Sequence, residues 1–452
     1  MTNISSSRLV SLPTWLCLLV LVVGLQLDSV GIAAESHPNI VLIVSDDQGW
    51  NDVGYHNSEI KSPTLDRLAS EGVRFDWHYV MPQCTPTRVC LMTGRYPSRF
   101  GNHCCLASNS HAFDFDTPTL ASVLREAGYE TALCGKWHLG SKPEWGPNHH
   151  GFDHSYGSLA GAVGMLDHRY RLGTSFTKTW HRNHEFVEEQ GHATDLVTAE
   201  AVKLLKADRD QPLFLYVPFH AVHTPLVEEE KWLAQNTHIE SADRRLYAAA
   251  VTHLDDCVRR IVEATEDMPN GRDTLVVFVS DNGAVINHGG NAYPPPDPKL
   301  RNFSSNAPLR SSKTHVYEGG IRVPAFAYWP GHLEPSVCDA PLHAVDWMPT
   351  LATLAGADLP DDTTLDGQDI WPQLNGQPAS DRELYWVWGS KRNRVALRAG
   401  DWKVLRDGPN QEWKLYNLKD DPYEKDNRAS AEPERLEQML DKVRQQKTGD
   451  AS

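Results

Sequence analysis

The stretch that decides the fold is residues 39–47, which read NIVLIVSDD. Its apolar run has the length of one β-strand, and a continuous run of this kind is typical of a strand buried on both faces of a parallel sheet. Open α/β sheets bind ligands beyond the carboxyl ends of their strands, where Asp46 and Asp47 stand in this chain. Two adjacent carboxylates repel each other unless a cation lies between them, so the pair indicates a site for a hard cation such as Ca²⁺ or Mg²⁺. The alternative is that the two aspartates only form a turn.

The same pattern returns at residues 274–282, TLVVFVSDN, where Asp281 and Asn282 follow a second apolar run. Shorter apolar runs at residues 130–134 and 212–217 also have strand length. Because parallel strands end at one edge of their sheet, two such polar pairs can close on a single metal ion. The sequence therefore predicts an α/β protein with a parallel sheet and oxygen ligands at one edge.

A helix is expected shortly after residue 81, in the stretch 81–95, MPQCTPTRVCLMTGR. Pro86 suits the first turn of a helix, and Gly94 suits its end. Cys84 then stands at the helix N-terminus, where free N–H groups and the positive end of the dipole favour an anion. Arg88, one turn further on, would direct a planar fork of donors at the same anion.

A second pair of polar residues, Lys136 and His138, follows the predicted strand at 130–134. In an extended segment residues two apart face the same side, so the two side chains would point together. A cation beside an imidazole can bind and process an anion. A Lys-x-His motif alone is more often a solvated loop, but the flanking glycines and the preceding strand favour a functional role here.

The composition is that of a globular protein: 452 residues, 40% hydrophobic and 23% charged, with a net charge of −16. The acidic balance argues against a nucleic-acid partner or an anionic membrane. A site for an anion would therefore be a local cationic pocket. Eight cysteines permit disulfides, but their spacing fixes no pairing.

The first 34 residues resemble a secretory signal peptide, with Arg8 before an apolar run and a small-residue exit at Ala33 and Ala34. The alternative is an N-terminal membrane anchor, although the run is short for a span. We expect a secreted or periplasmic protein, or a lysosomal one in a eukaryote, without stable membrane insertion.

The remaining pattern predicts a catalytic domain over residues 35–375 and a small α+β subdomain over residues 376–452. The latter contains four short strands and a charged helix at 432–446, the pattern of an antiparallel sheet with a terminal helix. Residues 141–194 are rich in Gly, His and Arg and are predicted to be irregular, a source of substrate-specific loops.

Taken in chain order, these motifs resemble those of the type I sulfatases. Cys84-x-Pro86-x-Arg88 followed by Thr-Gly-Arg resembles the first sulfatase signature, and residues 135–140, GKWHLG, resemble the second. The resemblance runs from about Asn39 to about Asp426 and is nearest to the arylsulfatases and N-acetylgalactosamine sulfatases. It implies an alkaline phosphatase-like fold, with a mostly parallel sheet between helices and a smaller C-terminal antiparallel sheet.

The resemblance also implies a Ca²⁺ site and a modified cysteine. A formylglycine-generating enzyme would oxidise Cys84 to formylglycine, whose hydrate carries one hydroxyl to attack sulfur and a second whose deprotonation releases sulfate. The implied Ca²⁺ ligands are Asp46, Asp47, Asp281, Asn282 and Cys84.

Five further positions match the family's catalytic and substrate-binding residues. Arg88 would hold the hydrate, Lys136 and Lys313 would clamp the sulfate, and His138 would be the base that triggers sulfate release. His223, in residues 218–225, PFHAVHTP, would give a proton to the leaving alcohol, helped if neighbouring anions raise its pKa, whereas His220 is expected to be structural.

One departure concerns the segment around Lys313. Sulfatases commonly have glycine at the two positions before this lysine, whereas this chain has Ser311 and Ser312. The departure puts the local backbone geometry in doubt.

The substrate implied by the resemblance is a sulfated small molecule or glycan: an aryl sulfate in vitro and a sulfated sugar in vivo. One alternative is a phosphonate monoester or phosphodiester hydrolase of the same superfamily. Its two-metal phosphatases use His and Asp for a second zinc, so Asn282 after Asp281 favours a single hard cation. The other alternative is a non-catalytic carbohydrate-binding protein.

Overall fold

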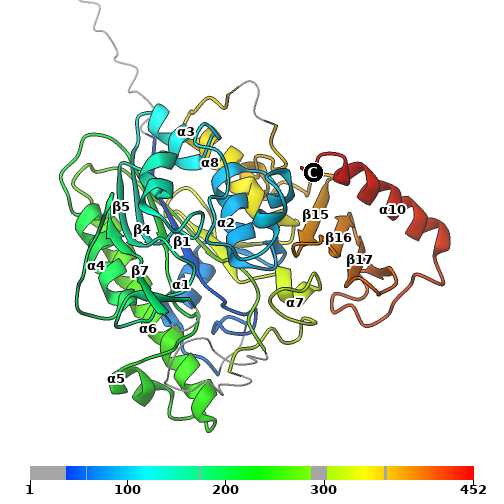
Figure 1. The fold of residues 1–452 in the computed structure, drawn as a ribbon, viewed down its shortest axis with the longest axis horizontal. Helices are drawn as coiled ribbons and strands as arrows, with labels where there is room; N and C mark the ends of the chain where they lie inside the picture. The colour runs from blue at the N-terminus through cyan, green and yellow to red at the C-terminus, as the bar shows by residue number, and fades with distance from the viewer. Residues whose placement is uncertain (1–36, 57–58, 173–174, 287–302, 361–363, 452) are drawn as a thin grey trace, which may run out of the picture. The chain divides into compact units, whose positions relative to one another are not determined.

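The computed structural model describes residues 37–451 apart from 57–58, 173–174, 287–302 and 361–363. The predicted signal peptide, residues 1–34, lies outside the described residues. Residues from His37 onward form one compact unit (Figure 1). No helix in the described part of the chain combines the length and the apolar character that a membrane span requires.

A ten-stranded sheet runs through the centre of this unit in the order β13-β2-β12-β11-β1-β10-β4-β5-β8-β9. Its middle strands, from β11 through β1, β10 and β4 to β5, are parallel, and antiparallel strands flank them on both sides. The ten strands are β1 (Asn39–Ser45), β2 (Val73–Phe75), β4 (Glu130–Lys136), β5 (His154–Ser158), β8 (Trp180–Arg182), β9 (Glu185–Phe186), β10 (Leu213–Pro218), β11 (Thr274–Ser280), β12 (Ala325–Tyr328) and β13 (Ser336–Cys338). The predicted mostly parallel sheet is confirmed.

The central strand β1 explains why the sequence shows a continuous apolar run. Ile40, Leu42 and Val44 belong to one hydrophobic core, and Val41 and Ile43 belong to another. Because neighbouring residues of a strand face opposite sides, a strand covered on both faces must be apolar at every position.

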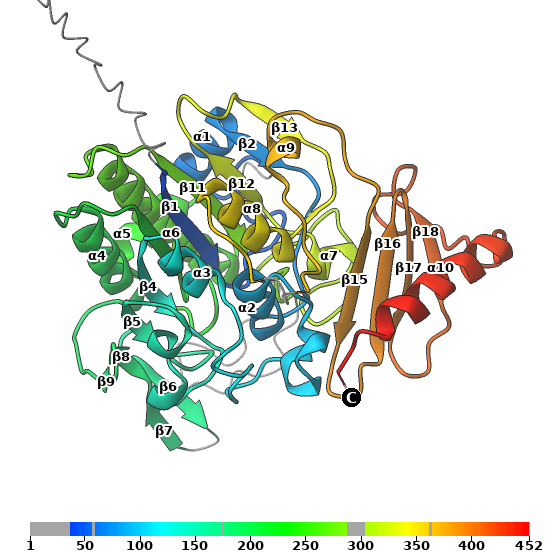
Figure 2. The ribbon, with the colours of Figure 1, turned by 90° about the horizontal axis from the view of Figure 1, so that it is seen from above.

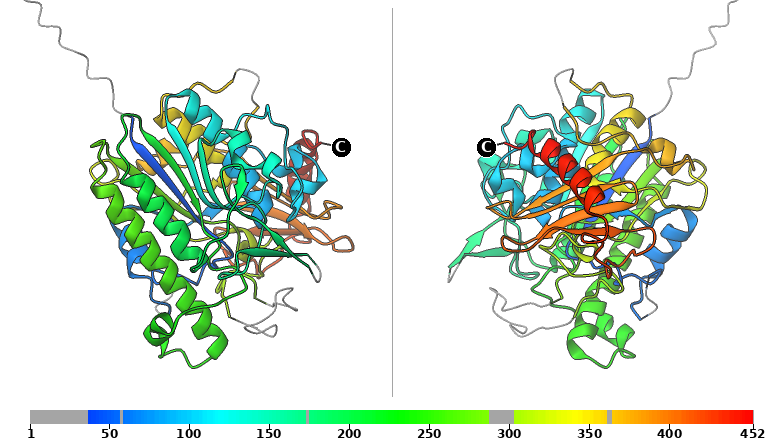
Figure 3. Two further views of the ribbon diagram at one scale, coloured as in Figure 1. Left: turned by 60° about the vertical axis from the view of Figure 1, so that its left-hand side comes forward. Right: turned by 90° about the vertical axis from the view of Figure 1, so that its right-hand side faces the viewer.

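Helices cover both faces of the sheet. On one face α4 and α6 lie side by side, with α1 beside α6 (Figure 3). On the other face α2, α3 and α8 pack together. The helices are α1 (Pro63–Glu71), α2 (Cys84–Thr93), α3 (Leu120–Glu126), α4 (Ala193–Leu205), α5 (Glu230–Leu233), α6 (Ala242–Glu266), α7 (Glu318–Ile321), α8 (Trp347–Leu354), α9 (Trp371–Leu374) and α10 (Pro433–Lys447).

The C-terminal region forms a separate antiparallel sheet in the order β15-β16-β17-β18, as predicted. Helix α10 packs against its strands β16 and β17 (Figure 2). These strands are β15 (Glu383–Trp388), β16 (Arg394–Ala399), β17 (Trp402–Asp407) and β18 (Lys414–Asn417). The domain boundary at residue 375 stays a prediction.

The sequence predicted that residues 141–194 are irregular, and this prediction is wrong for part of the segment. They contain β5, β8 and β9 of the large sheet, and the hairpin of β6 (Arg169–Leu172) and β7 (Ser175–Lys178). These strands are only two to five residues long and lie at one end of the sheet or outside it, so they lack the apolar runs of the central strands. A small parallel pair joins β3 (His78–Tyr79) to β14 (Leu342–His343).

The cysteines of the described residues are all unpaired and buried. The disulfide pairing that the sequence left open therefore has no counterpart in this part of the chain. The thiols instead occupy core positions, as with Cys134 in β4 and Cys257 in α6. A buried free cysteine behaves as a small hydrophobic side chain.

Candidate active site

The ends of β1 and β11 bring the four predicted oxygen ligands together. The two strands are parallel and Ser45 is paired with Ser280, so Asp46 and Asp281 leave the sheet side by side. The Asp47 N–H donates to Asp281 Oδ1 at 3.2 Å, and Asn282 Nδ2 donates to Asp47 Oδ1 at 2.7 Å. Parallel pairing thus brings together residues that are more than 230 positions apart in the chain.

Three cations face these carboxylates, one for each aspartate. Arg88 Nη2 lies 2.8 Å from Asp281 Oδ2, and Lys136 Nζ lies 2.5 Å from Asp46 Oδ2. Lys313 Nζ lies 2.6 Å from Asp47 Oδ1. We call these six residues the catalytic cluster: Asp46, Asp47, Asp281, Arg88, Lys136 and Lys313.

The carboxylates of the catalytic cluster, together with the neighbouring Asn282, fit a hard cation. Asp46 Oδ1 and Asn282 Oδ1 are buried and accept no hydrogen bond from the described residues. Burial and the charge of Asp281 raise the pKa of Asp46 to about 7, although Lys136 opposes the shift. Carboxylate and amide oxygens are the ligands that Ca²⁺ prefers, and a cation between them would relieve this crowding of negative charge.

Asp47 differs from Asp46 in its neighbours. Burial favours protonation of Asp47, but the charges of Lys313 and His223 outweigh it and lower its pKa below the usual range. Asp47 also adopts a left-handed backbone conformation with φ 63°, which turns it out of the strand direction. The cluster therefore holds at least one carboxylate firmly ionised.

Cys84 is the first residue of α2, as the sequence predicted. Together with His138, His223 and Lys313 it lines a cavity of about 180 Å³. Burial raises the pKa of the Cys84 thiol, although Lys136 and Lys313 oppose the shift. An unmodified thiol here stays protonated at neutral pH and is a poor nucleophile.

His138 reaches the cavity by a route that the sequence did not predict. Its φ is 56°, so the segment after Lys136 is left-handed at His138 rather than extended. Its Nδ1 is buried without a hydrogen-bond partner in the described chain. Gly161 packs so closely that a Cβ there would lie 2.0 Å from His138 Nε2. Burial, with help from Lys136, lowers the pKa of His138 well below its usual value, which keeps the imidazole neutral and able to accept a proton.

His223 lies on the segment after β10. Its Nδ1 is 2.5 Å from the Thr224 carbonyl oxygen, and its Nε2 is 3.5 Å from Asp47 Oδ2. Burial lowers the pKa of His223 to about 3, although Asp47 opposes the shift, so the surroundings do not give the raised pKa that would help a proton donor. The neighbouring His220 is buried and contacts Ser158 Oγ at 2.7 Å, in keeping with the structural role expected for it.

Among the other residues that line the catalytic cavity, Ser108, Asn109 and Tyr170 were not predicted from the sequence. Asn109 Oδ1 accepts a hydrogen bond from the Gly161 N–H at 3.2 Å, which fixes the loop that packs on His138. Tyr170 comes from β6, inside the segment predicted to be irregular. Short polar loops and a four-residue strand carry no clear periodic pattern, so no signal in this one sequence could have identified these residues.

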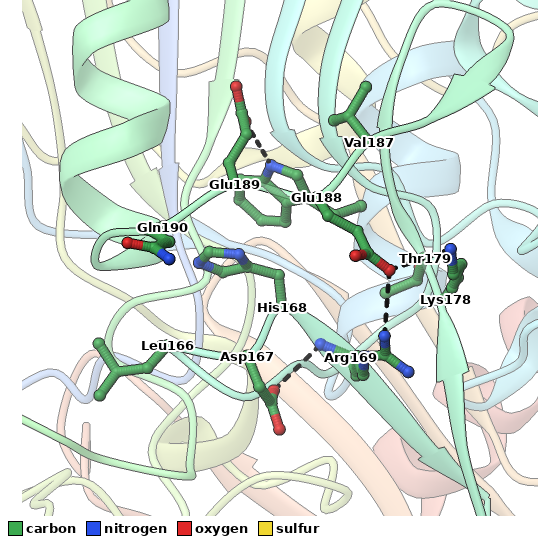
Figure 4. A pocket seen from close by; sticks show the side chains of 11 residues that line it. Leu166, Asp167, His168, Arg169, Lys178, Thr179, Val187, Glu188, Glu189 and Gln190 are labelled. Carbon is green, nitrogen blue, oxygen red and sulfur yellow. Dashed lines mark hydrogen bonds and ion pairs between the residues drawn. The ribbon is translucent and has the colours of Figure 1, made fainter.

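A second cavity, of about 300 Å³, lies on β6 to β9 and contains none of the predicted site residues (Figure 4). Figure 4 shows Arg169 and Lys178 both directed at Glu188, at 3.1 and 3.0 Å. Arg169 lines this cavity and its neighbour Tyr170 lines the catalytic one, so β6 separates the two cavities. The smaller cavity, which Cys84, His138 and His223 line, is the candidate active site.

Comparisons with known proteins agree with this geometry. A family model described as Sulfatase matches residues 38–357, and one described as N-sulphoglucosamine sulphohydrolase, C-terminal, matches residues 311–448. The chain therefore belongs to the sulfatase family, within the alkaline phosphatase superfamily, and the family resemblance of its motifs is confirmed. It is a sulfuric ester hydrolase.

Individual relatives give the same picture. Arylsulfatase J of Mus musculus is 31% identical, over 92% of this chain and 76% of its own length. N-acetylgalactosamine-6-sulfatase of Mus musculus is 32% identical, over 80% and 71%. The solved structure of Ps i-CgsB in complex with k-i-k-neocarrahexaose is 33% identical with a TM-score of 0.82, over 92% of this chain and 94% of that one.

Proposed function

We propose that this sulfatase hydrolyses a sulfated saccharide, with Cys84 matured to formylglycine and Ca²⁺ bound by Asp46, Asp47, Asp281 and Asn282. One observation carries the proposal: Cys84 opens α2 in a cavity that also holds His138, His223 and Lys313, beside the oxygen donors at the ends of β1 and β11. Hydrated formylglycine supplies one hydroxyl for attack on sulfur and a second for release of sulfate. Ca²⁺ at these oxygens would make such a hydroxyl more acidic.

The cations of the catalytic cluster bind and orient the ester. Arg88 is held by Asp281 and by the Lys136 carbonyl oxygen, which accepts from Arg88 Nη1 at 2.8 Å. Because both terminal nitrogens of Arg88 are already held, its positive charge can act on residue 84 without a further loss of side-chain entropy. Lys136 and Lys313 neutralise the sulfate oxygens, where negative charge grows in the transition state.

Two histidines move the protons. His138 is neutral and serves as the base that accepts a proton when sulfate is released. His223 gives a proton to the leaving alcohol, which requires the imidazolium form. A bound sulfate ester adds negative charge beside His223 and favours that form, so substrate binding itself raises the low pKa of His223.

The substrate class rests on the relatives and on the second cavity. Ps i-CgsB was solved with a neocarrahexaose, and other relatives are N-acetylgalactosamine-6-sulfatases. The cavity beyond β6 offers Arg169 and Lys178, with carboxylates and Gln190 around them, next to the strand that carries Tyr170. Such mixed polar walls suit the hydroxyl and sulfate groups of a neighbouring sugar. Export through residues 1–34 is part of the same proposal.

The first test is peptide mass spectrometry across residue 84, on protein made in a host with the maturation enzyme, combined with assays of sulfate release. We expect formylglycine at residue 84 and turnover of aryl sulfate and sulfated saccharides that disappears in Cys84→Ala. Cys90→Ala, in the same helix, is the control and should keep the modification and the activity.

Two outcomes would contradict the proposal. Formylglycine with hydrolysis of phosphonate monoesters but without sulfate release would favour the superfamily alternative. Full sulfatase activity with an unmodified thiol would overturn the role of Cys84.

The saccharide part is tested by a double variant, Arg169→Ala with Lys178→Ala. Hydrogen bonds to charged groups contribute roughly 1.5–3 kcal/mol, so KM for a sulfated oligosaccharide should rise by about tenfold or more. Turnover of a small aryl sulfate, which cannot reach across β6, should not change. An equal loss on both substrates would mean that the second cavity binds no part of the saccharide.

A further inference from the structure

A second group of side chains of the kinds that bind metal ions lies in the layer of α4 and α6, outside the catalytic cluster. His192 precedes α4 as its N-cap, Asp195 stands in the first turn of α4, and His253 lies in the middle of α6. Glu228 comes from the segment after β10. We call these residues the His253 cluster: His192, Asp195, Glu228 and His253. The side chains of His192, Glu228 and His253 are buried, whereas the Asp195 side chain is partly exposed, so an ion can enter the cluster beside it.

The ring of His253 has the surroundings of a metal ligand. Its Nδ1 lies 2.8 Å from Glu228 Oε2, and its face stacks on Trp232 with ring centres 4.7 Å apart. In protein metal sites, a carboxylate, a backbone carbonyl or a water on one ring nitrogen usually orients the other nitrogen as a ligand. Here the other nitrogen, Nε2, is buried and makes no hydrogen bond within the described chain, although Asp195 Oδ2 is only 3.3 Å away.

That separation fits two ligands of one ion. Zinc binds nitrogen and oxygen at about 2.0–2.2 Å, so two ligands on a tetrahedral ion lie roughly 3.3–3.5 Å apart. One ring nitrogen of His192 completes a group of three ligand atoms that all lie within 4.8 Å of one another. His192 Nε2 is 2.9 Å from the Val227 carbonyl oxygen, which orients this second ring. Its Nδ1 accepts a long hydrogen bond of 3.3 Å from the Thr194 N–H, which a metal ion bound at Nδ1 would replace.

We propose that the His253 cluster binds one divalent transition-metal ion, of the class of Zn²⁺, through His192, Asp195 and His253, with Glu228 as a positioning residue. Two imidazoles and one carboxylate are ligands that Zn²⁺ prefers, whereas Ca²⁺ prefers oxygens such as those of the catalytic cluster. The inference is independent of the proposed substrate and of the maturation of Cys84.

The ion would connect α4 and α6 to the segment after β10, which carries His223. His223 precedes Glu228 by five residues on the segment after β10, and α4 and α6 lie against one face of the sheet. A metal ion would connect α4 to α6 through His192, Asp195 and His253. Because Glu228 is hydrogen-bonded to His253, the ion would also fix the segment that carries Glu228 and His223. It would therefore stabilise the fold and the position of His223 without touching substrate.

The rival explanation needs no metal. Two carboxylates face His253, so a proton on its ring also balances the charge, and the cluster would then be a buried ion-pair network. The two explanations differ in what they predict for added zinc.

The test uses the full chain, freed of metal by a chelator and then saturated with Ca²⁺ to fill the catalytic cluster. Zn²⁺ titration by calorimetry should give one site per chain and a higher Tm. Glu228→Gln, which keeps the ligands, should weaken Zn²⁺ binding by about 10–100-fold. Asp195→Asn and His253→Ala should abolish the site, whereas His332→Ala, an exposed histidine, should bind zinc like the wild type.

Co²⁺ in place of Zn²⁺ gives a second readout, because a tetrahedral site with nitrogen ligands produces a characteristic visible absorption. This spectrum should be present in the wild type and lost in Asp195→Asn, a mild change that spares the fold even if His253→Ala does not. Equal zinc binding and an equal rise in Tm in the wild type and in Asp195→Asn would overturn the proposal in favour of the ion-pair network. Unchanged zinc affinity in Glu228→Gln would remove its positioning role.

Discussion

Two groups of buried charges in the described part of the chain invite comparison, because one of them borders the cavity of Cys84 and the other does not. The catalytic cluster stands at the ends of β1 and β11. The other group, which we call the Lys403 cluster, consists of Lys403, Glu318 and Glu424. Lys403 Nζ lies 2.7 Å from Glu318 Oε1 and 2.8 Å from Glu424 Oε1. Distances and burial alone do not distinguish the two clusters.

Their surroundings distinguish them. In the Lys403 cluster, the Tyr79 hydroxyl donates to Glu318 Oε2 at 2.8 Å and the Glu318 N–H donates to Glu424 Oε2 at 2.7 Å, so protein groups close the network. It connects β17 of the small sheet to α7. The catalytic cluster instead borders the cavity of Cys84. Asp46 Oδ1 and Glu424 Oε1 both lack a hydrogen bond in the described chain, but Glu424 Oε1 lies 2.8 Å from Lys403 Nζ. Of these two clusters, the one that borders a space for a ligand is therefore the candidate site.

The largest expected effects come from removing one lysine from each cluster. With Ca²⁺ present, Lys136→Met should lower kcat/KM by at least about 10²-fold, because a charge that stabilises the transition state is lost. Its unfolding free energy should change little, since Ca²⁺ compensates Asp46. Lys403→Met should instead lower the unfolding free energy by about 3–5 kcal/mol, because two buried carboxylates lose their partner.

The measurements are steady-state kinetics per folded molecule and urea unfolding of both variants. Lys403→Met molecules that remain folded should keep their turnover. A Lys403→Met enzyme that is stable but inactive, or a Lys136→Met enzyme that is active but unstable, would reverse the distinction between the clusters.

The sequence predicted the catalytic cluster and could not predict the Lys403 cluster. Asp46 and Asp281 follow apolar runs whose strands are paired in the fold, so local pattern and sheet geometry together imply that they meet. Glu318 and Lys403 are 85 residues apart and stand in no recurring motif. Their contact depends on how the small sheet packs against the rest of the chain.

Local sequence patterns also failed to predict two details of the candidate site, the backbone at His138 and the position of Tyr170. His138 itself has a left-handed backbone conformation, which a sequence pattern does not predict for a residue other than glycine. Tyr170 lies on a four-residue strand without apolar alternation. By contrast, β1 and α2 were predictable because their boundaries coincide with the apolar run and with the Pro86 and Gly94 signals.

A smaller effect is expected from Glu424→Gln. Burial and the charge of Glu318 raise the pKa of Glu424 from 4.5 to about 7, although Lys403 opposes the shift. The folded protein thus binds this proton more tightly than the unfolded chain does. The resulting stabilisation is full below about pH 4.5 and is lost as the pH rises through about 7.

Urea unfolding between pH 5 and pH 8 measures this loss. The wild type should lose on the order of 2 kcal/mol more than Glu424→Gln over this range. Glu434→Gln, on the exposed part of α10, is the control and should follow the wild type. Parallel pH profiles for wild type and Glu424→Gln would mean that Glu424 stays ionised throughout, as the aspartate paired with Lys313 does.

The smallest effect concerns the segment that brings Lys313 to the catalytic cluster. Ser311 has φ 71°, a conformation that favours glycine, and glycine is the residue that sulfatases commonly have there. The serine departs from the family pattern, yet Lys313 still reaches Asp47 at 2.6 Å. The site therefore accepts backbone strain at Ser311, and Ser311→Gly should relieve it, with a gain of up to about 1 kcal/mol in unfolding free energy and unchanged turnover.

Ser312 is the matched control because its φ is not positive, so Ser312→Gly should cost about 0.4–1 kcal/mol through the added freedom of the unfolded chain. If Ser311→Gly unfolded at lower urea than Ser312→Gly, the serine side chain, rather than the backbone, would determine how Lys313 is held.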